Sequence, residues 1–182
     1  MRRILLSCTL LALLALPAAA SAGASAQARP GYLVVRKAAG DGGVNGGPVV
    51  TLVIKGFVLG RVSQEARIDV VQLPSAVGQG APQVRGADVF TKSIKWHGFA
   101  GKKYVGSNFR FRAMGGYYRV VVRGSGVYLF AGGQCSHVKH VKCHVRLQGS
   151  SHYPRHDGEF SVNGGRFRSL PEKPLTRQIG RG

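Results

Sequence analysis

Residues 108–134 read NFRFRAMGGYYRVVVRGSGVYLFAGGQ, with apolar and polar side chains alternating around two groups of glycines. Alternation with a period of two is typical of β-strands that are buried on one face only. Glycine tolerates the positive φ angles of tight turns, so Gly115-Gly116 and Gly124-Ser125-Gly126 are predicted to be turns. The stretch therefore predicts three short antiparallel strands, against which the rest of the chain packs.

A turn at residues 115–116 also fixes which side chains share a face. It places Arg112 opposite Arg119, and Arg110 opposite Val121, on a face that points to solvent. The opposite face is apolar and is predicted to be the core, with Phe109, Phe111, Ala113, Tyr118, Val120 and Val122.

The outward face is the candidate binding site, and it is predicted to hold Arg110, Arg112, Arg119, Arg123 and Tyr128, with Phe130 beside them. Like charges directly opposite each other destabilise a hairpin by a few tenths to about 1 kcal/mol, and a bound anion relieves this repulsion. Guanidinium groups beside aromatic rings suit phosphate- or sugar-bearing polymers. The alternative is that a neighbouring strand covers Tyr128 and Phe130 while the arginines extend into water.

The other segments carry the same β pattern. Val, Ile and Thr dominate them, glycines interrupt them, and no long stretch has a helical period. About ten short strands with glycine-rich turns predict an all-β fold, a single antiparallel β-sandwich or barrel. The further strand-like segments are residues 29–37, 49–62, 65–73, 84–96, 143–148, 158–163 and 166–170.

The beginning of the chain has the layout of a secretory signal peptide. Arg2 and Arg3 precede an apolar run at residues 4–20, and small residues follow, so cleavage is expected after Ala26 or Ala28. The predicted organisation is a signal peptide at 1–26, a β-rich domain at 27–170 and a basic flexible tail at 171–182. These features predict a secreted or cell-envelope protein with no membrane span after cleavage.

The charge of the chain points to anionic partners. The sequence has 26 Lys and Arg against 7 Asp and Glu, a formal net charge of +19. Such a charge attracts polyanions. Outside the cytoplasm the candidates are anionic cell-envelope polymers, lipid headgroups and polysaccharides, and no specific nucleic acid is expected. The alternative is that the charge serves solubility alone.

The densest group of reactive side chains is a cysteine–histidine cluster at residues 135–144, CSHVKHVKCH. Cys135 and Cys143 remain after signal cleavage, and two cysteines in an exported chain pair by default, so a disulfide is the first interpretation. The second is a zinc or copper site formed by Cys135, His137, His140 and Cys143 or His144. Its spacing matches no standard structural metal site.

A nucleophilic cysteine is the third interpretation of this cluster. Exported all-β L,D-transpeptidases use a cysteine within a Ser-His-Gly-Cys run, with a His-Gly pair upstream. The chain resembles them in His97-Gly98 and in Cys135-Ser136-His137, but the cysteine precedes the Ser-His pair instead of following it, and the closing Arg or Asn is missing. A cysteine-dependent cell-wall enzyme therefore stays a minor alternative. No catalytic residue and no cofactor are predicted.

A broader resemblance covers residues 49–171. Residues 109–134, with GFVLGRV at 56–62, VRLQGS at 145–150 and DGEFSVNGGRFRSLP at 157–171, resemble small exported β-domain proteins of high-GC bacteria. Those proteins have no assigned activity, and the cluster at 135–144 departs from their pattern. The sequence thus predicts a non-enzymatic binding or envelope-associated protein, with a metal-binding module as the alternative.

Overall fold

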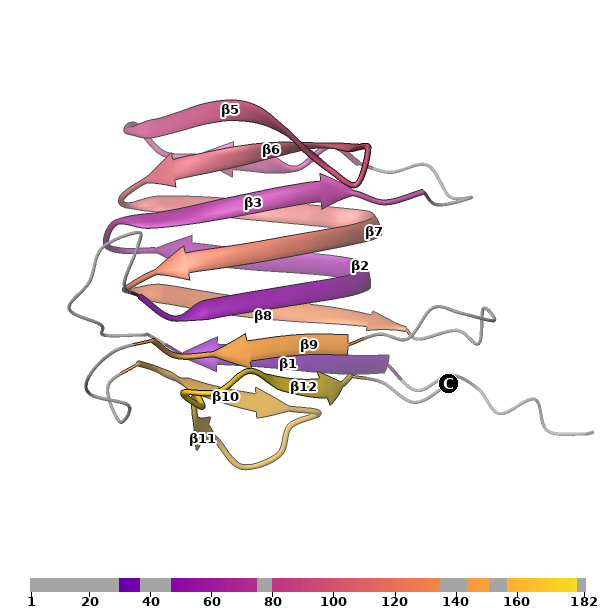
Figure 1. Cartoon of the computed structure of the whole chain (residues 1–182), viewed down its shortest axis with the longest axis vertical. Coiled ribbons are helices and arrows are strands. Elements are labelled where there is room, and N and C mark those ends of the chain that lie inside the picture. Colours follow the sequence, from indigo (N-terminus) through magenta and orange to yellow (C-terminus); the bar gives the residue numbers. More distant parts are fainter. Residues whose placement is uncertain (1–29, 37–46, 75–79, 135–143, 151–156, 180–182) are drawn as a thin grey trace, which may run out of the picture.

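The computed structural model of the 182-residue chain describes residues 30–36, 47–74, 80–134, 144–150 and 157–179. Within these ranges there is no helix, and the all-β expectation is confirmed (Figure 1). The strands are β1 (Pro30–Arg36), β2 (Val49–Val62), β3 (Ala66–Gln72), β4 (Gln83–Arg85), β5 (Val89–Trp96), β6 (Phe99–Gly106), β7 (Phe109–Gly124), β8 (Val127–Gln134), β9 (His144–Gln148), β10 (Glu159–Val162), β11 (Arg168–Ser169) and β12 (Leu175–Gln178). Over the same residues, no helix exists that is long and apolar enough to span a membrane.

All twelve strands belong to one antiparallel sheet that is folded over into two layers (Figure 1). The first layer has the order β12, β9, β2, β7, β3, β6, β5. The second layer has the order β11, β10, β1, β8, β2, β7, β4. The long strands β2 and β7 occur in both layers because each bends midway and passes from one layer to the other.

The bend is made by glycines at the same level of both strands. β2 and β7 pair from Val49 opposite Arg123 to Val62 opposite Phe109, with a register shift between Gly56 and Val58. Gly56 lies opposite Gly116, and its φ of 148° is rarely adopted by other residues. A β-carbon there would collide with the carbonyl oxygen of Gly132. A β-bulge of this kind bends and twists a strand, which turns the corner between the layers.

The predicted hairpin at residues 115–116 is therefore wrong. β7 continues through the glycines as one strand, and its two halves lie in different layers instead of pairing with each other. Arg112 lies opposite Leu59 of β2, whereas Arg119 lies opposite Val53 of the same strand. A long partner strand that bends at a matching glycine has replaced the local turn.

The second predicted turn, at residues 124–126, connects the two layers. β7 ends in the first layer and β8 begins in the second, so these consecutive strands do not pair. The turn packs against residues 63–65, which cross between the layers in the opposite direction. The amide of Ser63 donates a hydrogen bond of 3.0 Å to the carbonyl of Gly126, and the amide of Ser125 donates one of 3.4 Å to the carbonyl of Glu65.

The core lies between the layers and matches the predicted inward face. Alternate residues of β7 are buried on both sides of the corner: Phe109, Phe111, Ala113, Tyr118, Val120 and Val122. Beside them, β2 contributes five more buried side chains to the core: Val50, Leu52, Ile54, Val58 and Val62. The predicted alternation of buried and exposed side chains along β7 is thus confirmed, whereas the predicted strand pairing is wrong.

Two other expectations concern the ends of the chain. Residues 171–182 were expected to be a flexible tail, but Leu175–Gln178 form β12, which pairs with β9. Ile179 is also buried, with 1% of its surface exposed, so the chain is packed as far as this residue. The expected signal peptide at residues 1–26 lies outside the described residues.

Candidate functional site

A row of three arginines crosses the outer face of the second layer. Arg85 of β4 lies opposite Arg110 of β7, and Arg110 lies opposite Arg61 of β2. All three side chains are exposed. Tyr128 of β8 continues the row beyond Arg61. Neighbouring strands are about 4.8 Å apart, so three guanidinium-bearing residues fall within roughly 10 Å.

A second row lies beside the first, two residues nearer the corner. Arg112 of β7 stands between Gln83 of β4 and Leu59 of β2, and Leu59 lies opposite Phe130 of β8. The Nε atom of Arg112 donates a hydrogen bond of 2.8 Å to Oε1 of Gln83. This contact holds the guanidinium group near the first row of arginines.

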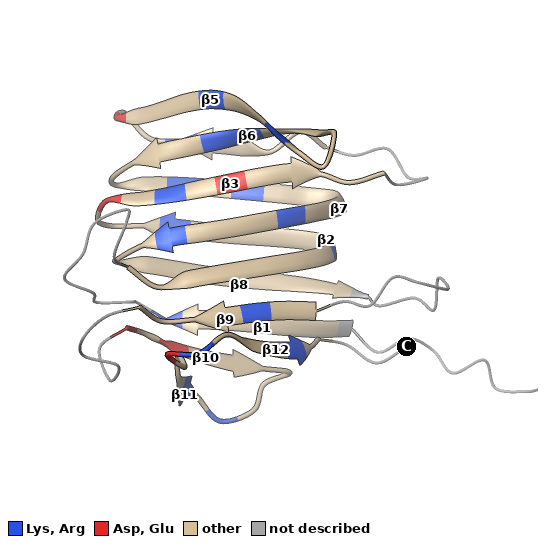
Figure 2. Ribbon diagram, in the orientation of Figure 1, with Lys and Arg blue, Asp and Glu red and all other residues tan. Residues whose placement is uncertain are grey.

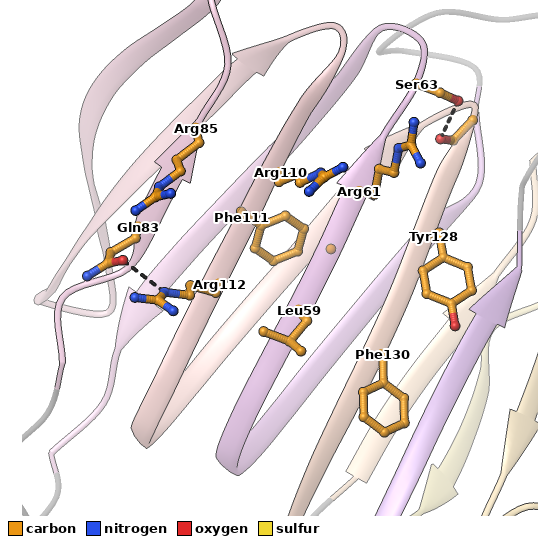
Figure 3. A pocket seen from close by; sticks show the side chains of 12 residues that line it. Leu59, Arg61, Ser63, Gln83, Arg85, Arg110, Phe111, Arg112, Tyr128 and Phe130 are labelled. Atoms are coloured by element: carbon orange, nitrogen blue, oxygen red, sulfur yellow. Dashed lines mark hydrogen bonds between the residues drawn. The ribbon is translucent and has the colours of Figure 1, made fainter.

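The two rows border a groove of about 870 Å³ on this face (Figure 3). We call it the basic groove; it is lined by Leu59, Gly60, Arg61, Ser63, Gln83, Arg85, Arg110, Phe111, Arg112, Gly126, Tyr128 and Phe130. Figure 3 shows Arg85, Gln83 and Arg112 at one side and Tyr128 and Phe130 at the other. The groove therefore has a cationic side, from β4, β7 and Arg61 of β2, and an apolar side, from Leu59 of β2 and the aromatic residues of β8.

The floor of the groove depends on a glycine. Gly60 of β2 lies opposite Phe111 of β7, and the Phe111 ring occupies the space where a side chain at position 60 would stand. Phe111 is buried, with 3% of its surface exposed. Because the ring extends across to β2, it ties together the two strands that carry Arg110 and Arg61.

Among the described residues, no ion pair joins an arginine of the basic groove to a carboxylate. The ion pair found in this part of the chain joins Arg67 to Asp69, at 2.7 Å, on β3 of the first layer. Figure 2 shows acidic residues on β3, on β10 and at chain turns, whereas basic residues are more numerous and are spread over both layers. The groove arginines are thus not neutralised by direct ion pairs with the described carboxylates.

The predicted arginine face is divided between the two layers. Arg110, Arg112 and Tyr128 lie in the basic groove, but Arg119 and Arg123 lie on the outer face of the first layer. The expectation that all five residues form one surface is wrong. The error follows from the corner in β7, which carries its second half to the opposite side of the molecule.

Arg119 has a different environment from the groove arginines. Its guanidinium group lies 4.5 Å from the centre of the Trp96 ring, in cation–π geometry. Burial lowers the pKa of Arg119, nearby Asp69 raises it, and Arg123 lowers it. Arg119 therefore packs on the first layer as a partly buried structural cation.

The aromatic residues beside the arginines are only partly covered. Tyr128 is 47% exposed, so no neighbouring strand lies over it. Phe130 is half-buried and contacts the rings of Tyr32 and Phe57, with centroid distances of 6.3 and 5.6 Å. An accessible aromatic surface therefore adjoins the cationic side of the groove.

The cysteine–histidine cluster falls outside this site. Cys135, His137, His140 and Cys143 lie outside the described residues. The flanking strands β8 and β9 pair with different halves of β2, so they are not the two arms of one hairpin. Among the residues that the structure does describe, no group of three His, Cys, Asp or Glu side chains could hold a metal ion.

Comparison with known proteins found no similar protein. No protein-family model matches the chain, and no significant match was found among curated proteins or solved structures. The site is therefore described from its own geometry.

Sequence reasoning missed the side chains that β2 and β4 contribute to the groove: Leu59, Arg61, Gln83 and Arg85. They lie 25 or more residues before Arg110 in the chain and reach it only through long-range strand pairing. One local signal was present: Leu59 and Arg61 have the same parity, so they share a face of β2. Nothing in the sequence shows which strand lies beside that face.

Proposed function

We propose that this chain is an exported, non-enzymatic binding protein whose basic groove binds the anionic groups of cell-envelope polymers or lipid headgroups. The observation that carries the proposal is the row Arg85, Arg110 and Arg61, three exposed like charges on adjacent strands that form no ion pair with a described carboxylate. Like charges directly opposite each other destabilise a sheet. A bound anion removes this repulsion. A surface with a purely structural role would have no need of three opposed arginines.

The chemistry of the side chains supports a phosphate-type ligand. A guanidinium group presents a planar fork of donors that matches the oxygens of phosphate and carboxylate groups. Arg61, Arg85 and Arg110 project from three neighbouring strands, so one or two tetrahedral anions can be held from several sides. Tyr128 offers a ring face beside Arg61 for a sugar or another flat group.

A charge-reversal pair tests the proposal with long-chain inorganic polyphosphate as the probe. Arg110→Glu and Arg123→Glu change the net charge equally, and both residues are exposed on β7. They lie on opposite layers, so only the first alters the basic groove. We expect Arg110→Glu to weaken binding at least tenfold by calorimetry, and Arg123→Glu to weaken it less than twofold.

The salt dependence of binding gives a second measure. When a protein neutralises several phosphates, its affinity falls steeply with salt, by roughly 0.7 to 0.9 logarithmic units per phosphate for each tenfold rise. The slope should become shallower in Arg110→Glu and stay unchanged in Arg123→Glu. Equal losses in the two variants would show that binding depends on net charge alone and would refute the groove as the site.

A further inference from the structure

The outer face of the second layer changes from cationic to apolar along its strands. Arg85, Arg110 and Arg61 form the row at one end of the groove. Two residues nearer the corner, the next row contains one arginine, Arg112, together with Gln83, Leu59 and Phe130. The row after that contains Phe57 opposite Gly132, which in turn lies opposite Tyr32 of β1. The arginines therefore decrease from three in the first row to one in the second, and the end of the face nearest the corner is apolar.

The apolar end is accessible to a ligand. Six large apolar side chains are exposed among the described residues, and Tyr32, Leu59 and Tyr128 of this face are three of them. Met114, a fourth, is 46% exposed, and the alternation along β7 places it on the same face as Arg112. Exposed apolar side chains that gather on one face of a protein mark a binding surface.

A uniformly charged polymer matches only the cationic side of this arrangement. On the far side of Arg61 the groove is lined by Tyr128 and Phe130 of β8. Apart from Arg61, neither β2 nor β8 contributes a cation to the groove lining. An extended polyanion would place charged groups against this apolar side and would lose their hydration without a partner. A ligand with one anionic end and one apolar end matches both sides of the groove.

We propose that the basic groove takes a single lipid phosphate, a phosphate ester of a long-chain alcohol. This inference rests on the proposed function, because the same arginines bind the phosphate. The phosphoryl group lies among Arg85, Arg110 and Arg61, and the alkyl chain follows Leu59 and Phe130 toward the corner. Four residues along a strand separate Arg61 from Phe57, so this path is about 13 Å long.

Alkyl phosphates of increasing length, used below the concentration at which they aggregate, test the inference by calorimetry on the whole protein. Complete burial of one methylene group is worth about a fourfold gain in affinity, and an open groove buries only part of the chain. We expect octyl phosphate to bind at least tenfold more tightly than butyl phosphate, and inorganic phosphate to bind most weakly.

Two serine variants separate the groove from other apolar surface. Leu59→Ser removes an exposed apolar side chain of the groove, and Phe90→Ser removes one that is 64% exposed on β5 of the first layer. The gain from butyl to octyl phosphate should fall at least threefold in Leu59→Ser and persist in Phe90→Ser. An equal loss in both variants would overturn the inference.

Other outcomes distinguish the inference from the proposed function. If polyphosphate binds and Arg110→Glu abolishes that binding, but chain length adds nothing, the inference is wrong and the proposed function stands. If vesicles of anionic phospholipid bind while octyl phosphate in solution does not, the face is a membrane-docking surface and the single-lipid site is refuted. If neither polyphosphate nor any alkyl phosphate binds, both proposals fail.

Discussion

Replacing Arg110 by glutamine should stabilise the free protein, because Arg110 stands between two other arginines. It lies directly opposite Arg85 on one side and Arg61 on the other. Two unit charges about 6 Å apart in water repel each other by about 0.7 kcal/mol. Removing the central charge relieves both repulsions, so we expect the free energy of unfolding to rise by roughly 0.5 to 1.5 kcal/mol at low ionic strength.

Thermal unfolding of Arg110→Gln at low and high salt measures this effect. For a protein of this size, 1 kcal/mol corresponds to about 2–4 °C, so the midpoint should rise by roughly 1–6 °C at low salt. The Debye length shortens to about 3 Å in 1 M salt, and exposed charges 6 Å apart are then screened. The difference between variant and parent should therefore disappear at high salt.

Arg112→Gln is the matched control on the same strand. The residues directly opposite Arg112 are Gln83 and Leu59, so no cross-strand arginine pair is relieved, and the hydrogen bond to Gln83 is lost. We expect no stabilisation. If Arg112→Gln gains as much as Arg110→Gln, net charge alone is responsible. If Arg110→Gln unfolds below the parent temperature at low salt, the arginine row is not a source of repulsion and the central argument for a ligand is lost.

Three further predictions concern packing and pH. Gly60→Ala should destabilise the protein by about 1–3 kcal/mol in urea unfolding, because the Phe111 ring fills that space, and adding Phe111→Leu should recover part of the loss. Ile179→Ala should cost about 2–5 kcal/mol, whereas a flexible tail would give no change. Burial raises the pKa of Tyr118, whose hydroxyl donates a hydrogen bond of 2.7 Å to the backbone carbonyl of Met114. Because of the raised pKa, the folded state holds the Tyr118 proton more tightly than the unfolded state does. The stability gained from this difference is present below about pH 10 and is lost as the pH rises further. Alkaline unfolding followed by tyrosinate absorbance should show this loss.

The sequence predicted side-chain orientation better than strand pairing, and β7 shows why. A tight hairpin and a bend between layers both keep the alternation of inward and outward residues on either side of Gly115 and Gly116. Phe111 and Val120 are therefore buried in both arrangements. The two arrangements differ only in the partner strand, and the partner here is β2, whose bend at Gly56 matches that of β7.

The chemical type of the site could be predicted from the sequence better than the set of residues that forms it. An outward face with arginines and an aromatic residue was correctly expected for Arg110, Arg112 and Tyr128. The neighbours Arg61 and Arg85 reach that face through pairings that no local pattern specifies. Predicting them would have required the register between strands distant in the sequence.

The tail was misassigned for a related reason. Residues 171–182 contain little apolar sequence, and a four-residue strand has too few positions for alternation to be recognised. β12 is held by pairing with β9, and Ile179 adds its side chain to the core. The pairing depends on a strand that is 27 or more residues away in the chain.

The position of β1 in the sheet has a consequence for how the chain folds during synthesis. This strand lies between β8 and β10, and both follow it by more than 90 residues. At a synthesis rate of roughly 5–20 residues per second, the first of these neighbours emerges about 5–20 seconds after β1. During that interval β1 has two unsatisfied edges, and unsatisfied strand edges recruit other chains. A holdase-type chaperone that masks the apolar β1 segment should therefore raise the yield of native protein when it is present during synthesis, and should have little effect when it is added afterwards.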